Sequence, residues 1–529
     1  MKKLFFSLFL TVFCLGAFAQ TSNDKKVSLE NKTTAGTFIN EIDKSFGIDL
    51  EAFSQFGSFD RPFIHSGLGN PNGVQARDFS RGEFTFGYYQ PGTMPMSFSF
   101  DFGGEAFGGI NRKGKSVKNT WDNIDHKKLL TTTTTTYNAM PVFESSNFST
   151  QVLLGLGNGM ATGVILDFNT RAYAPNINHY KKVKYEDHDN GDNNYEENYK
   201  NIISAPTFDP STGITSGTGE ANPRGFDFGV TVPFAFSLGD IKNVASVNID
   251  SYITTRNGSY KNSRKDNNID YKTKGIDART SLNLGYGVML PAGREEDYWF
   301  TKADLSFIFN SNNSKQDFKI KDSSIDASGD IQTKYKTGVQ FGFGVTGGRL
   351  FDFSSPSKVI SFRLKPTGHF DFNLGRRAAY NPKTTTKGSA GGIELSVTEE
   401  KFDEKPLITN INASMSLPMG LKILPENWKI GFILGATPEA GVRSIIRKNR
   451  NKDGAKTKSN TNGTTTESYD NITVESGVTA RSVAFYFAEE HNIGLTVPFE
   501  NGAHLDISMN GSNLLLLEAF TIQAFIPLK

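Results

Sequence analysis

The sequence has a single cysteine, and that residue lies at position 14. Cys14 sits inside an apolar run and follows Phe13, where the signal of a lipoprotein would have a small residue. Removal of the first residues on export would leave no cysteine in the chain. The exported chain would then lack the residue needed for a disulfide, a thiolate nucleophile or a cysteine metal site.

The sequence also lacks a charge bias and a second long apolar run. It has 57 Lys and Arg residues against 55 Asp and Glu residues, so its formal net charge is +2. This balance gives no basic bias for binding a nucleic acid, and we expect no nucleic-acid partner. A transmembrane helix needs roughly 20 consecutive apolar residues, and no stretch has this length. The sequence therefore excludes a helical membrane protein.

The first 19 residues have the organisation of a secretory signal peptide. Lys2 and Lys3 form a basic start, residues 4–15 form an apolar run, and Ala17, Phe18 and Ala19 form a cleavage site of the small-residue type. The apolar run is too short to cross a bilayer. We therefore expect the chain to be exported and cleaved near Ala19.

Apolar and polar residues alternate at a period of two over many segments, which places them on opposite faces of a strand. In residues 226–238 one face carries Phe226, Phe228, Val230, Val232, Phe234, Phe236 and Leu238. Similar alternation occurs in residues 96–102, 282–290, 305–309, 339–345, 430–434, 505–509 and 520–526. These lengths approach the roughly 9 to 11 residues of a membrane-crossing strand, whereas soluble strands average about 5 to 6. The pattern predicts an all-β fold.

Six segments consist of an apolar residue, a proline and another apolar residue. The prolines are Pro141, Pro233, Pro291, Pro418, Pro498 and Pro527. Proline cannot donate a ladder hydrogen bond, so we expect these six to lie at strand ends on one rim. Short turns follow them, whereas residues 174–224, 375–405 and 446–480 form long polar connections. This alternation is typical of outer-membrane proteins, with short periplasmic turns and long extracellular loops.

The rhythm of turns and loops predicts a single antiparallel transmembrane β-barrel of about 14 strands, within a range of 12 to 16. The expected strands are residues 95–107, 130–143, 159–173, 224–238, 243–256, 277–292, 296–310, 335–351, 357–374, 406–419, 427–443, 482–499, 502–510 and 518–528. Residues 83–89 and 148–156 also alternate and could change the count by two. The threonines at positions 131–136 are interpreted as strand because threonine favours strands.

The expected organisation is a signal peptide at 1–19, an N-terminal segment at 20–93 and the barrel at 94–529. In the N-terminal segment Phe38, Ile39, Ile42 and Phe46 have helical spacing. Two interpretations remain open for this segment. It is either a terminal arm or a plug that enters the lumen of the barrel.

The polar phase of the strands identifies the side chains that should line the lumen. These candidates are Asp227, Asp277, Arg279, Asp304, Lys336, Arg363, Lys365, His369, Asp371, Lys429, Glu439, His504 and Asp506. A wall with both signs of charge could bind polar or zwitterionic solutes, or its charges could pair and stiffen the barrel. Trp299 and Trp428 fall on the apolar phase near turns, where an aromatic girdle is expected.

The sequence shows no centre for catalysis, and we expect no enzyme, cofactor or metal. Residues 109–116 match a phosphate-loop pattern and residues 342–347 match a dinucleotide fingerprint, but neither stands between a strand and a helix. Acidic residues at 186–197 fail the spacing of a calcium loop. The histidines are scattered, without a His-Glu-x-x-His helix.

The signal peptide, the hairpin rhythm and the proline-marked strand ends together resemble a bacterial outer-membrane β-barrel over residues 94–529. The strand count and the preceding segment are similar in architecture to the long-chain fatty-acid transporter family. The nearest match to that family's Asn-Pro-Ala signature is Asn70, Pro71 and Asn72. The final residues Ile526, Pro527, Leu528 and Lys529 depart from the usual aromatic end of such barrels.

This resemblance implies a channel or transporter for small polar or amphipathic solutes in the outer membrane. Its partners would be outer-membrane lipid, the barrel-insertion machinery, and solutes or external ligands at the long loops. Two alternatives stay open. One is a surface adhesin or structural barrel with a blocked lumen, and the other is an outer-membrane hydrolase with a Ser or Asp beside a histidine.

Overall fold

The computed structural model describes most of the chain after residue 62. The described residues are 63–70, 81–90, 96–107, 112–122, 127–139, 143–157, 160–173, 178–202, 205, 207–209, 213–215, 223–265, 267–293, 297–322, 326–353, 355, 359–390, 392–402, 406–425, 428–448, 451–470, 473–475, 479–499, 503–511 and 519–527. Almost all of them are in β-strands. Within these ranges no helix is long and apolar enough to cross a membrane.

The strands and the short 3-10 helix within the described residues have the following bounds. They are β1 (Phe63–Asn70), β2 (Arg81–Gln90), β3 (Met96–Phe107), β4 (Arg112–Trp121), β5 (Leu129–Ala139), β6 (Phe143–Gly157), β7 (Met160–Tyr173), β8 (Asn178–Asp187), η2 (Gly191–Asn193), β9 (Tyr195–Lys200), β10 (Thr207–Asp209), β11 (Gly213–Thr215), β12 (Pro223–Leu238), β13 (Ile241–Arg264), β14 (Asn267–Pro291), β15 (Tyr298–Asp322), β16 (Asp326–Lys336), β17 (Gly338–Asp352), β18 (Ile360–Leu364), β19 (Thr367–Gly375), β20 (Tyr380–Ala390), β21 (Ile393–Lys401), β22 (Leu407–Ser416), β23 (Met419–Ile423), β24 (Gly431–Lys448), β25 (Asn451–Asp453), β26 (Ala455–Thr461), β27 (Thr464–Tyr469), β28 (Thr473–Glu475), β29 (Thr479–Pro498), β30 (His504–Gly511) and β31 (Ala519–Pro527).

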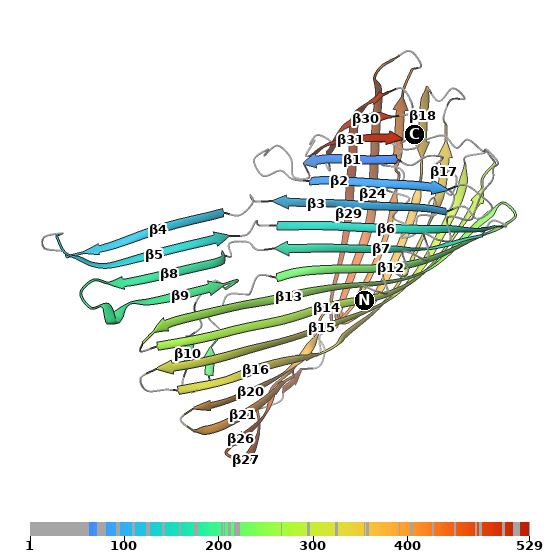
Figure 1. Cartoon of the computed structure of the whole chain (residues 1–529). Helices are drawn as coiled ribbons and strands as arrows, with labels where there is room; N and C mark the ends of the chain where they lie inside the picture. Colours follow the sequence, from blue (N-terminus) through green and yellow to red (C-terminus); the bar gives the residue numbers. More distant parts are fainter. Residues whose placement is uncertain are drawn as a thin grey trace.

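Antiparallel pairing closes these strands into a ring (Figure 1). The order is β1, β2, β3, β6, β7, β12, β13, β14, β15, β17, then β19 with β18, then β22 with β23, then β24, β29, β30 and β31. β31 pairs with β1 and completes the ring. The fold is therefore an all-β, antiparallel, closed barrel.

The ring has sixteen positions when each broken strand, β18 with β19 and β22 with β23, counts once. Sixteen exceeds the central estimate of about 14 and equals the upper limit of the expected range of 12 to 16. β1 and β2 belong to the ring although they precede the expected boundary at residue 94. β6 takes the position expected for residues 130–143, because β5 pairs with β4 and β8 instead.

The connections expected to be long loops continue the wall as strands on one side of the ring (Figure 1). We call this sheet the extension. It runs through β4, β5, β8, β9, the distal halves of β13, β14 and β15, and then β16, β20, β21, β26 and β27. The turn of β26 and β27 shows why a hairpin forms here. Asn462 and Gly463 both have positive φ, as a two-residue hairpin turn of type I′ requires.

The two faces of the ring have opposite chemistry, and the apolar face is the exposed one. On β12, Phe228 is 46% exposed and Val232 is 45% exposed, whereas Thr231 and Ala235 on the opposite face are only 5% and 7% exposed. The same alternation of exposed apolar residues and more buried small or polar residues continues along β14 and β15. The predicted alternation is confirmed, and its apolar phase points away from the inside of the ring.

The six prolines do not all mark strand ends. Pro291, Pro498 and Pro527 end β14, β29 and β31, but Pro233 lies inside β12 and is buried. In the described residues the pairing of β12 with β7 skips Val232 and Pro233, and the Thr162 hydroxyl donates to the Pro233 carbonyl at 2.8 Å. Proline is tolerated there because the ladder itself is interrupted.

The remaining two prolines are Pro418 and Pro141. Pro418 lies in the break between β22 and β23, where its carbonyl accepts the N–H of Lys365 at 2.9 Å. Its prediction as a strand end next to a turn is wrong, because β23 continues the wall beyond it. Pro141 lies outside the described residues.

The inward phase of the ring continues into the extension, where it carries an apolar cluster. Its buried members are Tyr199, Ile202, Tyr260, Ile269, Tyr271, Phe318 and Ile320. The Tyr199 and Tyr260 hydroxyls donate to the two carboxylate oxygens of Glu197 at 2.8 and 3.2 Å. Burial, and next the neighbouring Glu197, raise the pKa of both tyrosines above the usual value of 10. Both hydroxyls therefore stay neutral in the folded protein at alkaline pH.

These raised pKa values predict that the extension loses stability above about pH 10. An unfolded tyrosine ionises near pH 10 while Tyr199 and Tyr260 stay protonated, so folding is opposed by up to about 1.4 kcal/mol per hydroxyl for each further pH unit. We expect denaturation followed by near-ultraviolet circular dichroism to show a falling free energy of unfolding above pH 10. The double variant Tyr199→Phe/Tyr260→Phe should show a shallower fall, and an unchanged slope would contradict the assignment.

If β31 pairs with β1 and closes the ring, two cysteines introduced at partner positions of these strands should form a disulfide. Ser66 and Ala524 are register partners, and paired strands place such Cα atoms about 4.5 to 5.5 Å apart, within the range of a disulfide. In a Cys14→Ser background, Ser66→Cys with Ala524→Cys should form an oxidant-dependent crosslink visible by gel mobility.

Two cysteine pairs serve as controls for this crosslink. Ile507→Cys with Ile522→Cys joins neighbouring strands and should also crosslink. Ser66→Cys with Leu505→Cys spans two strand spacings, about 10 Å, and should not. Crosslinking of the β30–β31 pair without the β1–β31 pair would show that the ring is open.

Candidate functional site

The most connected group of polar side chains on the inward face surrounds His369. Thr346 on β17 is the register partner of His369 on β19, and Asp371 follows two residues later on the same face. The Thr346 hydroxyl lies 2.7 Å from Nδ1 of His369, and Asp371 Oδ2 lies 2.5 Å from Nε2. Both ring nitrogens are therefore engaged, and the orientation of the imidazole is fixed.

The group continues across three more strands. Asp371 is the register partner of Asn412 on β22, and Asn412 is the partner of Arg443 on β24. The hydroxyl of Tyr486 on β29 lies 2.7 Å from Glu439 Oε1 and 3.4 Å from Asn412 Oδ1. The Arg443 guanidinium lies 6.0 Å from the centre of the Tyr486 ring. We call these inward-facing residues, with Thr346, His369 and Asp371, the histidine wall.

On its other side the histidine wall meets β15. Lys302 and Asp304 form an ion pair of 2.8 Å. Gly344 lies between Asp304 and Asp371 in the register, and a Cβ atom on this glycine would lie 2.9 Å from Asp371 Oδ1. Glycine at this position therefore gives room to two carboxylates on neighbouring strands.

A second polar group lies on β7, β12 and β13. Gly229 is the register partner of both Asp167 and Asp250, so it separates two carboxylates on the inward face. Ser149 donates to Asp167 at 2.6 Å, and Asp227 lies one inward position along β12 from Gly229. We call this group the acidic wall.

Basic residues from β13 and β14 border the acidic wall. Arg256 forms an ion pair of 2.8 Å with Asp277, and Arg279 is the register partner of Tyr252. Among the predicted lumen residues, Asp227, Asp277 and Arg279 thus belong to one wall, while Asp304, His369, Asp371 and Glu439 belong to the other. All seven lie on the inward phase of their strands, and their role in lining a lumen stays a prediction.

Three predicted residues lie toward the end of the ring that carries the short turns. Arg363 donates to Asp352 Oδ2 at 2.7 Å. Lys365 lies in the break between β18 and β19, is buried, and places its ammonium 4.5 Å from the centre of the Phe300 ring. Asp506 on β30 is 2% exposed. Lys365 and Asp506 are packed among other side chains, whereas Arg363 is partly exposed.

The three remaining predictions have other outcomes. Lys336 ends β16, where the pairing of β16 with β20 shifts its register. The alternation of β17 therefore does not predict which face Lys336 is on, and Lys336 belongs to the extension. Lys429 precedes β24 and is exposed in the connection from β23. His504 begins β30, and its side chain lies outside the described residues.

Several residues of the two walls were not predicted. Asp167, Asp250, Lys302, Arg443 and Tyr486 all have the inward phase of their strands. Extending the alternation by two residues from Asp304 would have found Lys302. Tyr486 lies opposite Gly441, and a Cβ atom on this glycine would lie 2.6 Å from the ring, a match that sequence spacing cannot show.

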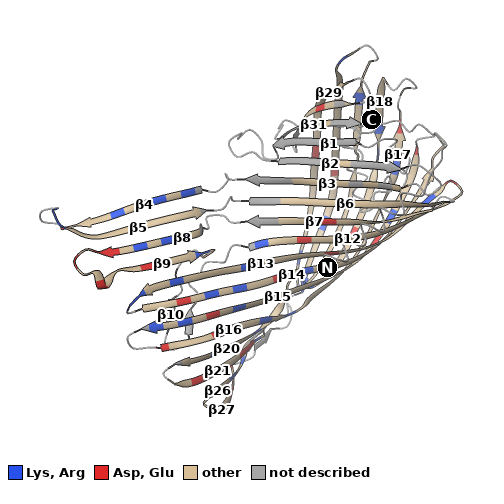
Figure 2. Cartoon of the chain, in the orientation of Figure 1, with Lys and Arg blue, Asp and Glu red and all other residues tan. Residues whose placement is uncertain are grey.

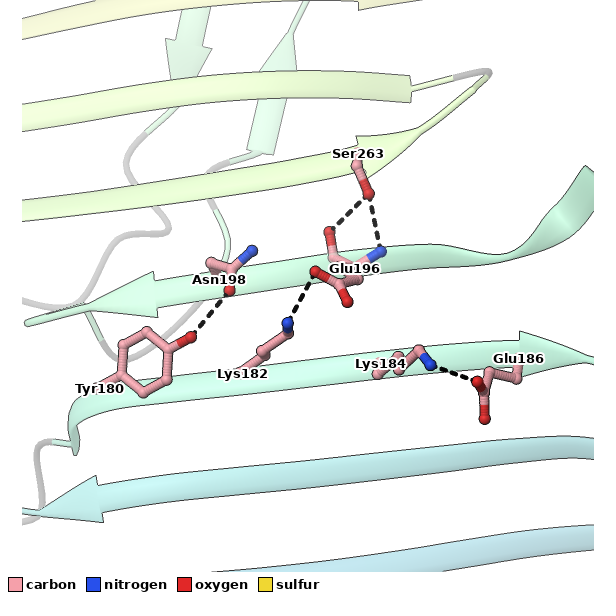
Figure 3. A network of polar contacts seen from close by, with 7 residues as sticks. All are labelled: Tyr180, Lys182, Lys184, Glu186, Glu196, Asn198 and Ser263. Atoms are coloured by element: carbon pink, nitrogen blue, oxygen red, sulfur yellow. Dashed lines mark hydrogen bonds and ion pairs between the residues drawn. The ribbon is translucent and has the colours of Figure 1, made fainter.

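The phosphate-loop pattern, the dinucleotide fingerprint and the acidic segment form strands and a hairpin. Residues 342–347 lie in β17, and Gly114, Lys115 and Ser116 lie in β4, so neither pattern precedes a helix. The acidic segment forms the hairpin of β8 and β9, where Lys182 pairs with Glu196 at 2.9 Å and Lys184 with Glu186 at 2.5 Å (Figure 3). Within the described ranges no group of three His, Cys, Asp or Glu residues could hold a metal.

Thr346, His369 and Asp371 contain the three groups of a hydroxyl, histidine and carboxylate triad. A triad also needs N–H donors that stabilise the oxyanion. The strand of Thr346 is paired on both sides, with Lys302 on β15 and His369 on β19, so its backbone is committed to the sheet. This geometry favours a structural polar wall over an acyl-transfer site.

The strands and their two faces define a closed antiparallel barrel with a polar inner wall. No protein-family model matches the chain, and no curated protein matches its sequence. The ferric yersiniabactin uptake receptor from Yersinia pestis aligns at 7% identity over 89% of this chain and 80% of that chain, with a TM-score of 0.24.

Two further solved structures align over similar lengths. An iron transporter from Neisseria meningitidis gives 7% identity, coverage of 91% and 83%, and a TM-score of 0.28. The pyoverdine receptor from Pseudomonas aeruginosa gives 8% identity, coverage of 88% and 78%, and a TM-score of 0.29. TM-scores this low do not establish a shared fold, so the barrel assignment rests on this chain's own strand pairing. The similarity to the fatty-acid transporter family stays a prediction.

The hydrogen bonds of Tyr486 predict a measurable loss of stability in Tyr486→Phe. The change removes the donor to Glu439 and Asn412, and a hydrogen bond to a charged group contributes about 1.5 to 3 kcal/mol. Urea unfolding of the protein in detergent micelles should show a decrease of that order. The matched control is Tyr252→Phe, on the same inward face, because no described residue is hydrogen-bonded to the Tyr252 hydroxyl. An equal decrease in the free energy of unfolding in both variants would contradict a stabilising role for the Tyr486 hydrogen bonds.

Proposed function

We propose that this chain is an integral β-barrel of a bacterial outer membrane. The observation that carries the proposal is the inversion of the usual arrangement, with large apolar side chains exposed on the outer face and polar ones facing inward. A soluble protein does not leave a continuous apolar surface of this extent in water. The inversion is what a lipid environment around a polar interior requires.

The height of the apolar belt matches a bilayer. On β14 the outward apolar residues run from Ile276 to Leu290, fourteen residue steps, or about 46 Å at roughly 3.3 Å per residue. A strand tilt of about 45° reduces this length to about 33 Å. On β12 the span from Phe226 to Leu238 gives about 28 Å by the same calculation. Both values are close to the roughly 25 to 30 Å of the hydrocarbon region.

Aromatic residues mark the belt at the end with the short turns. Trp299 and Trp428 are exposed there, as predicted, and Trp428 packs edge-on against Phe432. The Arg349 guanidinium lies 5.1 Å from the Trp299 ring centre and 4.3 Å from that of Phe351. Aromatic rings with a cation beside them suit the interface between lipid and water. We assign this end to the periplasm and the extension to the outside.

We further propose that the lumen conducts small polar or amphipathic solutes. The histidine wall and the acidic wall provide both signs of charge, together with amide and hydroxyl groups. Gly229 and Gly344 keep the space beside the carboxylates free of side chains. A wall of this kind can replace part of the hydration shell of a polar solute.

A structural barrel with a blocked lumen is the second candidate, and one observation favours it. Inward residues near the short turns are almost fully buried, among them Leu153, Lys365, Ile433 and Thr496. Side chains this buried leave no water-filled path along that part of the wall. The two candidates therefore differ in whether this end opens.

Planar-bilayer recording of the purified chain separates the two candidates. If the lumen conducts, Asp167→Asn/Asp250→Asn should shift the reversal potential in a salt gradient toward anion permeation, because two inward carboxylates are lost. The matched control is Asp317→Asn/Asp330→Asn, register partners on the outward face of the extension, which should leave the reversal potential unchanged.

Each possible result of the recording decides between the candidates. Silent bilayers with protease-verified insertion would reject the conduction pathway and favour the structural barrel. A chain that stays dissolved without detergent would reject the membrane assignment altogether, because the apolar belt would then have to be covered by protein.

A further inference from the structure

Four lysines lie on the outward face of the extension, on four consecutive strands and next to the apolar belt. They are Lys274 on β14, Lys315 on β15, Lys334 on β16 and Lys383 on β20, and all four are exposed. We call them the lysine band. Figure 2 shows that basic residues recur along the extension, whereas the ring strands carry fewer.

The register places the four lysines in two directly opposed pairs. Lys274 is the cross-strand partner of Lys315, and Lys334 is the partner of Lys383. Opposed side chains in a sheet have Cβ atoms about 4.5 to 5.5 Å apart, and like charges at that distance are destabilising. Two such pairs on neighbouring strands bring four positive charges together on one face.

Two carboxylates lie beside the lysine band, because Glu400 on β21 is the register partner of Lys383 and Asp317 lies next to Lys315. Lys315 forms an ion pair of 2.7 Å with Asp317 on its own strand. In the part of the chain that the structure describes, Lys274, Lys334 and Lys383 form no ion pair. By contrast, Lys182 and Lys184 on the same sheet each pair with a glutamate. Three ammonium groups of the lysine band are therefore available to an external anion.

The position of the band identifies the source of that anion. Lys274 is the next outward residue on β14 after Ile276, which is 52% exposed and ends the apolar belt. Lys334 is the partner of Asn313, two outward positions beyond the exposed Phe309 on β15. In a bilayer that covers the belt, this level lies among the lipid headgroups.

We propose that the lysine band binds the phosphate groups of anionic lipids in the leaflet on the side of the extension. This inference rests on the proposed membrane barrel. Each opposed lysine pair presents two ammonium groups to one phosphate, and the band spans two neighbouring pairs. Basic residues at a membrane surface contribute roughly a factor of five each to binding an anionic surface at moderate ionic strength.

The test measures lipid retained by the full-length protein in native mass spectrometry, using phosphatidylglycerol and phosphatidylcholine as probes. The wild type should retain phosphatidylglycerol in preference to phosphatidylcholine, and the preference should weaken with added salt. The variant Lys274→Gln/Lys315→Gln/Lys334→Gln/Lys383→Gln should bind phosphatidylglycerol at least tenfold more weakly.

The matched control changes the same number of charges elsewhere on the extension. Lys113→Gln/Lys115→Gln/Lys118→Gln/Lys127→Gln alters exposed lysines on and next to β4 and should retain phosphatidylglycerol like the wild type.

Three results would overturn the lipid site. Equal retention by the wild type and the band variant, when both insert into vesicles, would reject the site and leave the membrane barrel intact. Full displacement of phosphatidylglycerol by millimolar inorganic phosphate would identify a free anion as the ligand. A wild type that does not insert into vesicles would reject both the barrel and the lipid site.

Discussion

Backbone hydrogen bonding is the constraint on which this structure depends. A strand in lipid has no water to satisfy its N–H and C=O groups, so an edge inside the membrane costs several kcal/mol for each unpaired group. The pairing of β31 with β1 removes both edges from the ring. The extension has no such closure, because in the described residues β4 pairs only with β5, and β27 only with β26. In the proposed membrane barrel its edges would be tolerable only in water, so the extension would lie outside the bilayer for the same reason that the ring is closed.

The second constraint is that a strand has two faces, and this links the ring to the extension. Along β13, β14 and β15 the inward phase runs without a break from the polar walls to the buried Tyr260, Tyr271 and Phe318. The outward phase changes over the same strands from apolar residues to the lysine band. Between β16 and β17 the pairing shifts register near Lys336, and the phase changes there. A long strand thus carries two environments in sequence, while a bulge is needed to exchange its faces.

Much of the barrel could be predicted from the sequence because alternation is a local signal. For this reason the alternation places Asp227, Asp304 and His369 on the inward phase and Trp299 on the outward phase, where their strands have them. Partner choice is not local. The threonines of β5 favour a strand, but only the pairing with β4 and β8 shows that this strand leaves the ring and that β6 replaces it. Pro233 was misplaced because the gap in the ladder beside it depends on β7, which is distant in the sequence.

The glycines of the inward face explain how a wall with many polar groups can stay thin. Tyr252 lies over Gly225, where a Cβ atom would come within 2.6 Å of its hydroxyl, and Tyr486 lies over Gly441 in the same way. A ring that occupies a glycine site lies along the wall and does not project toward the barrel axis. Tyr486 then reaches Glu439 and Asn412 within the sheet surface, so these polar groups are held at the wall. Because the wall chemistry alone is compatible with an open and with a blocked lumen, conduction must decide between the two.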